Sequence, residues 1–406
     1  MDHDFDVVIV GAGPAGCTCA YLLAGKGLNI ALIEKSIFPR DKVCGDALSP
    51  DVINQLNLIN PQWIEQFQKS VAKKPSEGIR LIAPNFRMLD INFNQPEGLK
   101  LDGFVAKRID FDHFMFNQIK RLQDITIFQG QKVESLERNR EEINIFTNDH
   151  KIKCKMVMGA DGAQSVVNRA LSDNKIDKKH YCAGVRQYFS GIEGMEHNKI
   201  ELHFYRELLP GYFWIFSLPN NQANVGMGML SDEISRNKID LKEMLRSLLS
   251  NHPNLKDRFR NALPLEEIKG FGLPIGSRKV QCSGDGFLLL GDAACLIDPF
   301  TGEGIGNAIR SGRIAAKHLL KAFTEKRFDA AFNKSYDQKL YSKMWAELRI
   351  SRKMQMLLRY PWIFNLLVKK AERNESLHHL LTSMITDPDL RKELRKPSFY
   401  AKLFFR

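Results

Sequence analysis

The sequence predicts an α/β fold in which a parallel-sheet domain, assembled from separated segments, carries an inserted antiparallel sheet and a helical C-terminal region. Three observations support this prediction. An apolar run at residues 5–10 enters a Gly-rich turn and a helical pattern, and a second segment of this kind begins at Phe287. Residues 197–230 have the alternation and turns of antiparallel strands, whereas the chain beyond Arg310 has helical periodicity.

The first Gly-rich segment is GAGPAG, and it follows a β-branched run typical of a strand buried on both faces. Gly11 allows the tight turn, Gly13 lets the backbone approach a pyrophosphate, and Gly16 lets the next helix pack close to the strand. Pro14 and Ala15 open that helix, where a missing N–H costs nothing and the free N–H groups attract phosphate. The segment therefore predicts a Rossmann-like dinucleotide-binding unit.

The acidic residue expected in such a unit is present. A second strand over residues 29–33 leads to Glu34 and Lys35. Glu34 lies 23 residues after Gly11, the spacing of the acid that accepts hydrogen bonds from ribose hydroxyls. An acid here favours an adenosine ribose without a 2′-phosphate, which indicates FAD or NAD rather than NADP.

Composition narrows the class of protein. The net charge is +12, and residues 340–406 contain 14 Lys and Arg against six Asp and Glu. No apolar run approaches the ~20 residues that span a bilayer, and no secretory signal precedes the first strand. Seven cysteines without a CxxC pair predict neither a disulfide framework nor a zinc site. We expect a cytoplasmic protein that binds no nucleic acid, since no such motif accompanies the charge.

The basic C-terminal region allows two interpretations. Residues 355–370 combine an aromatic and apolar stretch around Trp362 with Arg359, Lys369 and Lys370. A basic amphipathic helix of this kind suits the surface of an anionic membrane, which would make the protein a peripheral membrane protein. A helix that covers the core and leaves its charges in solvent fits equally well.

Further motifs follow along the chain. GADG ends an alternating strand at residues 159–162, and GDAACLIDPFTGEGIGNAI occupies residues 291–309. PRDKVCGDALSP occupies residues 39–50, and GYFWIFSLPNNQANVGMG occupies residues 211–228. With GAGPAG, these segments resemble FAD-dependent oxidoreductases of the p-hydroxybenzoate hydroxylase fold and, within that fold, the geranylgeranyl reductase family.

The resemblance implies an FAD site with particular ligands. Asp161 and Gly162 would help to hold the cofactor, Gly291 and Asp292 would grip the ribityl chain, and Arg108 would contact the flavin. A helix would begin at the flavin N1/C2=O edge, where its N-terminus stabilises the reduced anion; its first residues are Gly304, Ile305, Gly306 and Asn307. The residues alone leave open that Asp161 is a turn residue, that Asp292 is a helix cap and that Arg108 is solvated.

The resemblance also places the loop at residues 39–50 against the isoalloxazine. Cys44 would lie near the reacting face, with Gly45 in the turn, and both would border the cofactor. We take Cys44 and Asp46 as candidate catalytic residues, with ordered water as a further proton source. The family often has a second Gly where this chain has Asp46, so a purely structural Cys44 remains an alternative.

Aromatic side chains in the fourth motif are candidates for the substrate site. Tyr212, Trp214 and Phe216 alternate along one predicted strand and therefore share a face. They would line an apolar substrate tunnel, or they would be ordinary core residues.

The predicted organisation and function follow from these motifs. We expect an FAD-binding domain at residues 1–75, 100–180 and 277–323, a substrate domain at 76–99 and 181–276, and a helical basic region at 324–406. The resemblance implies reduction of C=C bonds in an isoprenoid lipid or lipid precursor by flavin hydride, with NAD(P)H or a ferredoxin as electron donor. The alternative activity is an FAD-dependent monooxygenase or halogenase acting on an apolar aromatic substrate. A prenyl-binding protein without flavin chemistry is a third class, which the intact Asp292 motif disfavours.

Overall fold

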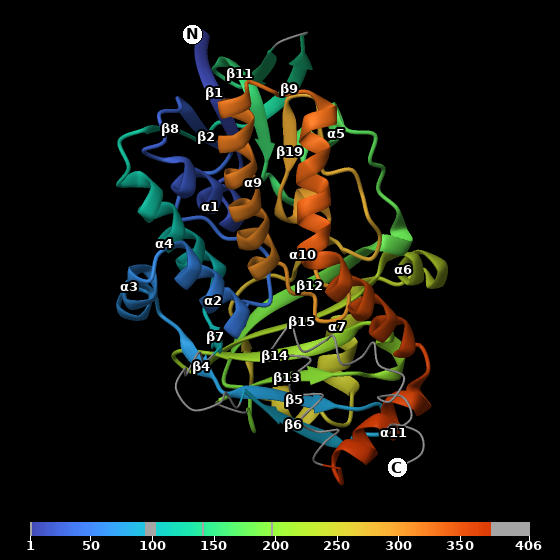
Figure 1. The fold of residues 1–406 in the computed structure, drawn as a ribbon. Helices are drawn as coiled ribbons and strands as arrows, with labels where there is room; N and C mark the ends of the chain where they lie inside the picture. The colour runs from blue at the N-terminus through green and yellow to red at the C-terminus, as the bar shows by residue number, and fades with distance from the viewer. Residues whose placement is uncertain (1, 94–102, 140–141, 196–197, 375–406) are drawn as a thin grey trace.

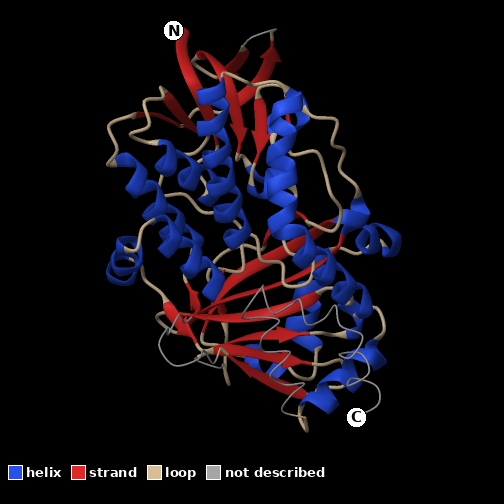
Figure 2. Ribbon diagram, viewed as in Figure 1, coloured by secondary structure: helices blue, strands red, loops and turns tan. Residues whose placement is uncertain are grey.

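The computed structural model describes residues 2–93, 103–139, 142–195 and 198–374. Two sheets occupy opposite ends of this part of the molecule, and helices cover both (Figures 1 and 2). The long helix α10 (Ala330–Leu357) runs from the first sheet to the second. The predicted α/β class, with an antiparallel sheet and C-terminal helices, is confirmed.

The first sheet is parallel at its centre. Its strand order is β18-β19-β11-β1-β2-β8, and β10 and β9 extend it antiparallel from β11. The bounds are β1 (Asp2–Val10), β2 (Ile30–Glu34), β8 (Ile125–Gln129), β9 (Val133–Arg138), β10 (Ile143–Thr147), β11 (Lys151–Gly159), β18 (Ser283–Gly284) and β19 (Phe287–Leu289). Because β1, β2, β11 and β19 run parallel, the loops that follow them meet at one edge of the sheet.

The helices that pack on this sheet are α1 (Pro14–Leu23), α4 (Arg108–Lys120), α5 (Val166–Leu171) and α9 (Ile305–Glu325). Small residues bring α1 and α9 close together, whereas α4 buries large side chains such as Phe111 and Phe114. A Cβ on Gly16 would lie 1.9 Å from the Gly11 carbonyl oxygen, so α1 approaches the turn after β1 as closely as the motif predicts. A Cβ on Gly312 would lie 2.5 Å from the Ala15 carbonyl oxygen, which lets α9 pack directly on α1.

The second sheet is largely antiparallel. Its order is β16-β12-β15-β14-β13-β5-β6, with β17 also paired to β12. The bounds are β5 (Gly78–Ile82), β6 (Met88–Asn92), β12 (Tyr181–Ser190), β13 (Lys199–His203), β14 (Tyr212–Leu218), β15 (Gln222–Leu230), β16 (Leu263–Pro264) and β17 (Lys269–Pro274). β13 pairs parallel with β5, so the segment before residue 94 joins strands more than a hundred residues further along the chain.

Smaller elements connect the sheets. They include β3 (Ala47–Leu48), α2 (Pro50–Ile59), α3 (Gln62–Ser70), β4 (Lys74–Ser76) and β7 (Gly103–Val105). The helices α6 (Ser231–Asn237), α7 (Leu241–Asn251), α8 (Lys256–Phe259) and α11 (Pro361–Ala371) border the second sheet. Helical periodicity over residues 51–70 predicts one helix, whereas the chain forms two, because Pro61 cannot continue the hydrogen bonding of α2. None of the described helices is long and apolar enough to cross a bilayer.

The contact at Gly16 yields a stability prediction. Gly16→Ala should lower the free energy of unfolding by more than about 2 kcal/mol and reduce FAD affinity, because the added methyl group separates α1 from the turn at Gly11. Urea unfolding and FAD titration measure the two effects. Gly270→Ala is the control, since its Cβ would meet only atoms at ordinary contact distances, 3.6 Å and beyond. Equal losses in both variants would contradict the prediction.

Candidate functional site

A cavity of about 740 Å³ lies between the two sheets. One part of its wall consists of the loops that follow β1, β2, β11 and β19. The other part is a face of the second sheet, formed by residues of β5, β13, β14 and β15. The cavity therefore joins two regions of different chemistry, a polar loop edge and an apolar sheet face.

The turn after β1 is shaped for a phosphate group. Gly11 has φ +100°, and a Cβ there would lie 2.4 Å from the Ala160 carbonyl oxygen, so no other residue fits. The N-cap of α1, Gly13, offers no side-chain hydrogen bond, and the first turn of α1 contains no acidic residue. The N-terminal N–H groups and the helix dipole of α1 therefore face the cavity as an anion site.

Glu34 is positioned next to this turn. Its carboxylate accepts hydrogen bonds from the N–H of Ala12 at 3.0 Å and from the N–H of Ser36 at 3.1 Å. The neighbouring Arg40, which no motif singled out, donates to Asp112 at 2.6 Å and also lines the cavity. The carboxylate and the guanidinium therefore border the place where a ribose and a pyrophosphate would meet.

Asp161 has both a structural partner and an unused acceptor. One carboxyl oxygen accepts the N–H of Val166 at 2.7 Å, whereas Oδ1 is buried without a hydrogen-bond partner among the described residues. Burial raises the pKa of Asp161. A buried, unpartnered acceptor in a cavity wall is what a donor group of a ligand would satisfy.

The start of α9 forms the other polar wall. Gly291 has φ +57°, and Asp292 lies 3.5 Å from the Lys42 ammonium, so Asp292 is in an ion pair rather than serving only as a cap. The N-cap of α9, Gly304, is without a side-chain hydrogen bond, and no acid lies in the first turn. This helix end, like that of α1, presents a positive dipole to the cavity.

Arg108 begins α4 and is buried rather than solvated. Its guanidinium makes two hydrogen bonds to Asp112, at 2.8 and 2.9 Å, and only 3% of the residue is exposed. Burial alone would lower the pKa of Arg108, but the Asp112 carboxylate outweighs burial and raises it. Arg108 therefore stays cationic in the cavity wall, with the Cys44 thiol beside it.

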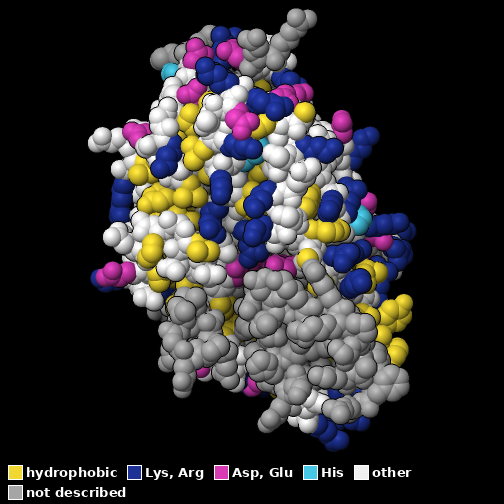
Figure 3. Space-filling model, in the orientation of Figure 1, with side chains coloured by type: hydrophobic (Ala, Val, Ile, Leu, Met, Phe, Trp, Pro, Cys, Tyr) yellow, Lys and Arg dark blue, Asp and Glu magenta, His cyan; other side chains and the backbone are white. Residues whose placement is uncertain are grey.

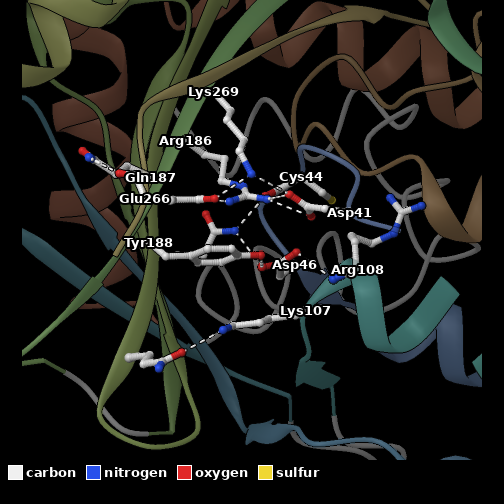
Figure 4. A network of polar contacts seen from close by, with 12 residues as sticks. Asp41, Cys44, Asp46, Lys107, Arg108, Arg186, Gln187, Tyr188, Glu266 and Lys269 are labelled. Atoms are coloured by element: carbon white, nitrogen blue, oxygen red, sulfur yellow. Dashed lines mark hydrogen bonds and ion pairs between the residues drawn. The ribbon is translucent and has the colours of Figure 1, made fainter. Parts of the chain in front are cut away.

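The loop that carries Cys44 is held from behind by Asp46 (Figure 4). Asp46 is fully buried with φ +68°, a conformation that non-Gly residues rarely adopt. Its carboxylate accepts the N–H of Arg108 at 3.1 Å, the hydroxyl of Tyr188 at 2.7 Å and the amide of Asn224 at 2.8 Å. Burial raises the pKa of Asp46 to about 6.

An ion cluster ties the same loop to the second sheet. Arg186 of β12 is fully buried, donates to both carboxyl oxygens of Asp41, at 3.0 and 2.8 Å, and pairs with Glu266. Lys269 also contacts Asp41, at 3.2 Å (Figure 4). The Arg186 guanidinium stacks over the Tyr188 ring at 3.9 Å, which joins the cluster to Asp46.

The sheet face of the cavity is apolar. Tyr212, Trp214 and Phe216 all line it, as their alternation along β14 predicts. The same wall contains Ile79, Leu81, Ile200, Leu202, Phe204 and Phe300. Trp214 packs against Gly226 of the neighbouring strand, where a Cβ would lie 2.3 Å from the indole ring. Aromatic and aliphatic side chains thus form a surface suited to a hydrocarbon chain.

Most of the predicted cofactor-binding and catalytic residues line the cavity, and four of them lie behind its wall. Gly16 packs against Gly11, and a Cβ on Gly306 would meet Asp51, at 2.5 Å. The Asn307 amide donates to the Leu296 carbonyl at 2.8 Å, and the Asp46 carboxylate is enclosed by its partners. The wall residues are Gly11, Gly13, Pro14, Ala15, Glu34, Lys35, Cys44, Gly45, Arg108, Asp161, Gly162, Gly291, Asp292, Gly304 and Ile305.

Sequence reasoning missed several wall residues. Arg40 and Lys42 belong to the loop motif at residues 39–50 and could have been found there as cations next to it. Gln131, Lys132 and Val133 also line the cavity, but no motif marks them, because they reach the site only through the pairing of β8 with β2. No motif marks Arg186 either, because it reaches the site on β12, a strand of the second sheet.

The hydrogen-bonding groups of the cavity wall fit FAD. Two helix N-termini without caps, the glycine turn at Gly11 and the unpaired Asp161 oxygen are what a pyrophosphate-linked dinucleotide with a polyol chain requires. No cluster of metal-ligating side chains exists among the described residues. The fold and the site together define an FAD-binding protein.

Comparisons with known proteins agree with this class. A family model described as an FAD binding domain matches residues 4–349. A digeranylgeranylglycerophospholipid reductase from Methanococcus vannielii is 31% identical over 88% of this chain and 87% of its own length. A menaquinone reductase from Mycobacterium tuberculosis is 27% identical over 96% of this chain and 93% of its own length. The chain belongs to the geranylgeranyl reductase family of FAD-dependent oxidoreductases.

Solved structures share the fold. A geranylgeranyl bacteriochlorophyll reductase-like protein from Thermoplasma acidophilum superposes with a TM-score of 0.82 at 22% identity, covering 97% of this chain and 99% of the other. The halogenase PltM in complex with phloroglucinol and FAD superposes with a TM-score of 0.73 at 18% identity, covering 96% and 85%. At these identities the likeness establishes architecture alone.

The buried Asp46 yields a pH prediction. Its folded pKa of about 6 lies above the usual 3.8, so ionising it disfavours the folded state. The contribution of protonated Asp46 to the free energy of unfolding is fully present below pH 4 and is lost as pH rises through about 6. Over this interval the free energy of unfolding of the wild type should therefore fall by up to ~3 kcal/mol relative to that of Asp46→Asn. Urea unfolding at a series of pH values measures the difference, and a constant difference would contradict the assignment.

Proposed function

We propose that this protein reduces C=C bonds of an isoprenoid chain on a lipid or lipid precursor. The observation that carries the proposal is the single cavity that joins the FAD-binding loops to an apolar sheet face. Bound FAD in its reduced form would supply the hydride from N5. Relatives named for a phospholipid and for menaquinone support a lipid substrate.

The chain's own residues would exclude water and hold the alkene. An isolated alkene accepts hydride poorly, so protonation has to precede hydride transfer or accompany it. Positioning therefore matters more than covalent chemistry, and Tyr212, Trp214 and Phe216 would provide it. Cys44 is the candidate proton donor in the cavity wall, with ordered water as the alternative. Asp46 would influence the reaction indirectly, because its hydrogen bonds hold the loop that carries Cys44.

The electron donor would be NAD(P)H bound transiently or a ferredoxin. The glycines at 270 and 272 lie in strand β17 and open no helix, so they provide no second dinucleotide loop. We therefore propose that the reductant reaches the flavin through the cavity between the sheets.

An FAD-dependent monooxygenase or halogenase acting on an apolar aromatic compound is the second candidate. The aromatic side chains of the cavity wall, Tyr212, Trp214 and Phe216, favour it, because they suit an aromatic substrate as well as a hydrocarbon chain. In that case reduced flavin would react with O₂ rather than with the substrate's double bond. Oxygen dependence therefore separates the two functions.

The test is anaerobic reoxidation of the photoreduced holoenzyme. When a geranylgeranyl lipid is added, the oxidised flavin spectrum should return, and mass spectrometry should show that the lipid has gained two hydrogens.

Cys44→Ser should retain FAD and slow reoxidation by roughly 10²-fold if the Cys44 thiol donates the proton. Reoxidation only after admission of O₂ would overturn the reductase and favour the second candidate.

We also propose a cytoplasmic protein with peripheral membrane contact through its C-terminal region. In the described part, Phe364 and Val368 of α11 pack against the second sheet, whereas 63% of Trp362 and 55% of Tyr360 are exposed. Lys and Arg side chains are also frequent on the face of α9 and α10 that this view shows (Figure 3). One side of α11 thus covers the sheet, and the proposed membrane contact would use the exposed side; residues 375–406 lie outside the described residues.

Vesicle binding tests the membrane contact. Changing Lys369 and Lys370 to Gln should weaken sedimentation with phosphatidylglycerol vesicles by roughly fivefold per charge, since each basic residue at an anionic surface contributes about 1 kcal/mol. Trp362→Ala should weaken it further. Lys26→Gln, an exposed cation after α1, is the control. Unchanged binding in the double Lys variant would exclude this helix as the contact.

A further inference from the structure

One buried amide lies where the two sides of the cavity meet. Asn224 of β15 is fully buried, and its Nδ2 donates to the Cys44 carbonyl at 2.7 Å and to the Asp46 carboxylate at 2.8 Å. Its Oδ1 accepts the indole N–H of Trp214 at 2.8 Å. Both donor hydrogens and the acceptor are therefore used, and every partner is part of the cavity wall or directly supports it.

On the loop side, Asn224 holds the peptide that carries the Cys44 thiol. The left-handed backbone at Asp46 is unfavourable for a residue with a side chain and persists only because several contacts hold it. Gly45 lies so close to Phe216 that a Cβ would be 2.9 Å from the ring. The loop therefore lies flat on β14, and the carbonyl of Cys44 is directed at the Asn224 amide.

On the substrate side, the same amide orients Trp214. The indole ring fits over Gly226, which leaves room for it. The hydrogen bond from the indole N–H to Asn224 directs the nitrogen edge of the ring toward the Cys44 loop, where a Cβ on Gly45 would lie 3.7 Å from that nitrogen. Cys44 and Trp214 come from segments about 170 residues apart in the sequence, and Asn224 contacts both.

We propose that Asn224 is a positioning residue that sets Cys44 and Trp214 in register with each other through one amide. The placement of Cys44 requires no assumption about the substrate. The consequence for turnover rests on the proposed function, because it assumes that the alkene lies between Trp214 and the flavin.

Thiol alkylation of the FAD-loaded protein tests the placement of Cys44. In Asn224→Ala the loop loses its anchor, so iodoacetamide should modify Cys44 about tenfold faster, as peptide mass spectrometry would show. Flavin absorbance verifies that FAD remains bound. Asn333→Ala is the matched control: Asn333 is a fully buried amide that donates at 2.8 and 2.9 Å to two carbonyls beside β18, away from the loop. An unchanged rate in Asn224→Ala would overturn the proposal.

A paired exchange keeps the test decisive if Asn224→Ala does not fold. Asn224→Asp places an oxygen against the Cys44 carbonyl and the Asp46 carboxylate. Adding Asp46→Asn restores the hydrogen bond between positions 46 and 224 with donor and acceptor exchanged, but restores none to the Cys44 carbonyl. The double variant should regain thermal stability while Cys44 stays reactive. If alkylation returns to the wild-type rate, the carbonyl contact is not what positions Cys44, and the proposal fails.

Turnover provides the second readout. Trp214→Phe keeps an aromatic ring and removes the indole N–H, so it should raise KM for a geranylgeranyl lipid several-fold with FAD affinity unchanged. Combined with Asn224→Ala, the two effects on KM should be less than additive, because one hydrogen bond is lost in both. Full additivity would overturn the link to Trp214. Absence of any lipid turnover would refute the proposed function but leave the alkylation result to decide the role of Asn224.

Discussion

The buried carboxylate of Asp46 is the interaction on which the arrangement of the site depends. It receives a backbone N–H from α4, beside the first sheet, and side-chain donors from β12 and β15 of the second sheet. A carboxylate removed from water is stable only when such donors surround it. The Cys44 loop can therefore adopt its left-handed turn only when both halves of the molecule are in place.

The polar part of the cavity wall follows from the direction of the parallel strands. Because β1, β2, β11 and β19 end at the same edge, residues from four separate segments form one polar wall. The two uncapped helix N-termini at Gly13 and Gly304 give that wall its preference for negative charge. Arg108 adds a permanent cation, which its pair with Asp112 keeps in place.

The apolar part of the cavity wall follows from alternation along antiparallel strands. Every second residue of β14 and β13 faces the cavity, so one face presents hydrocarbon while the other packs against α7 and α8. The ion cluster of Arg186, Asp41 and Glu266 then fastens this sheet to the Cys44 loop. The sheet face and the loop that together line the cavity are thereby held against each other.

The sequence by itself determined the local units: the turn at Gly11, the acid at Glu34, the start of α9 and the shared face of Tyr212, Trp214 and Phe216. These depend on contacts within about 30 residues, which spacing and residue type encode. Only the tertiary structure decided that Asp46 lies behind the wall, that Arg108 is buried, and that Arg40, Arg186 and Asn224 belong to the site. Each of these residues has at least one hydrogen-bond partner between 62 and 180 residues away along the chain, and pairing over such separations is set by how the two sheets dock.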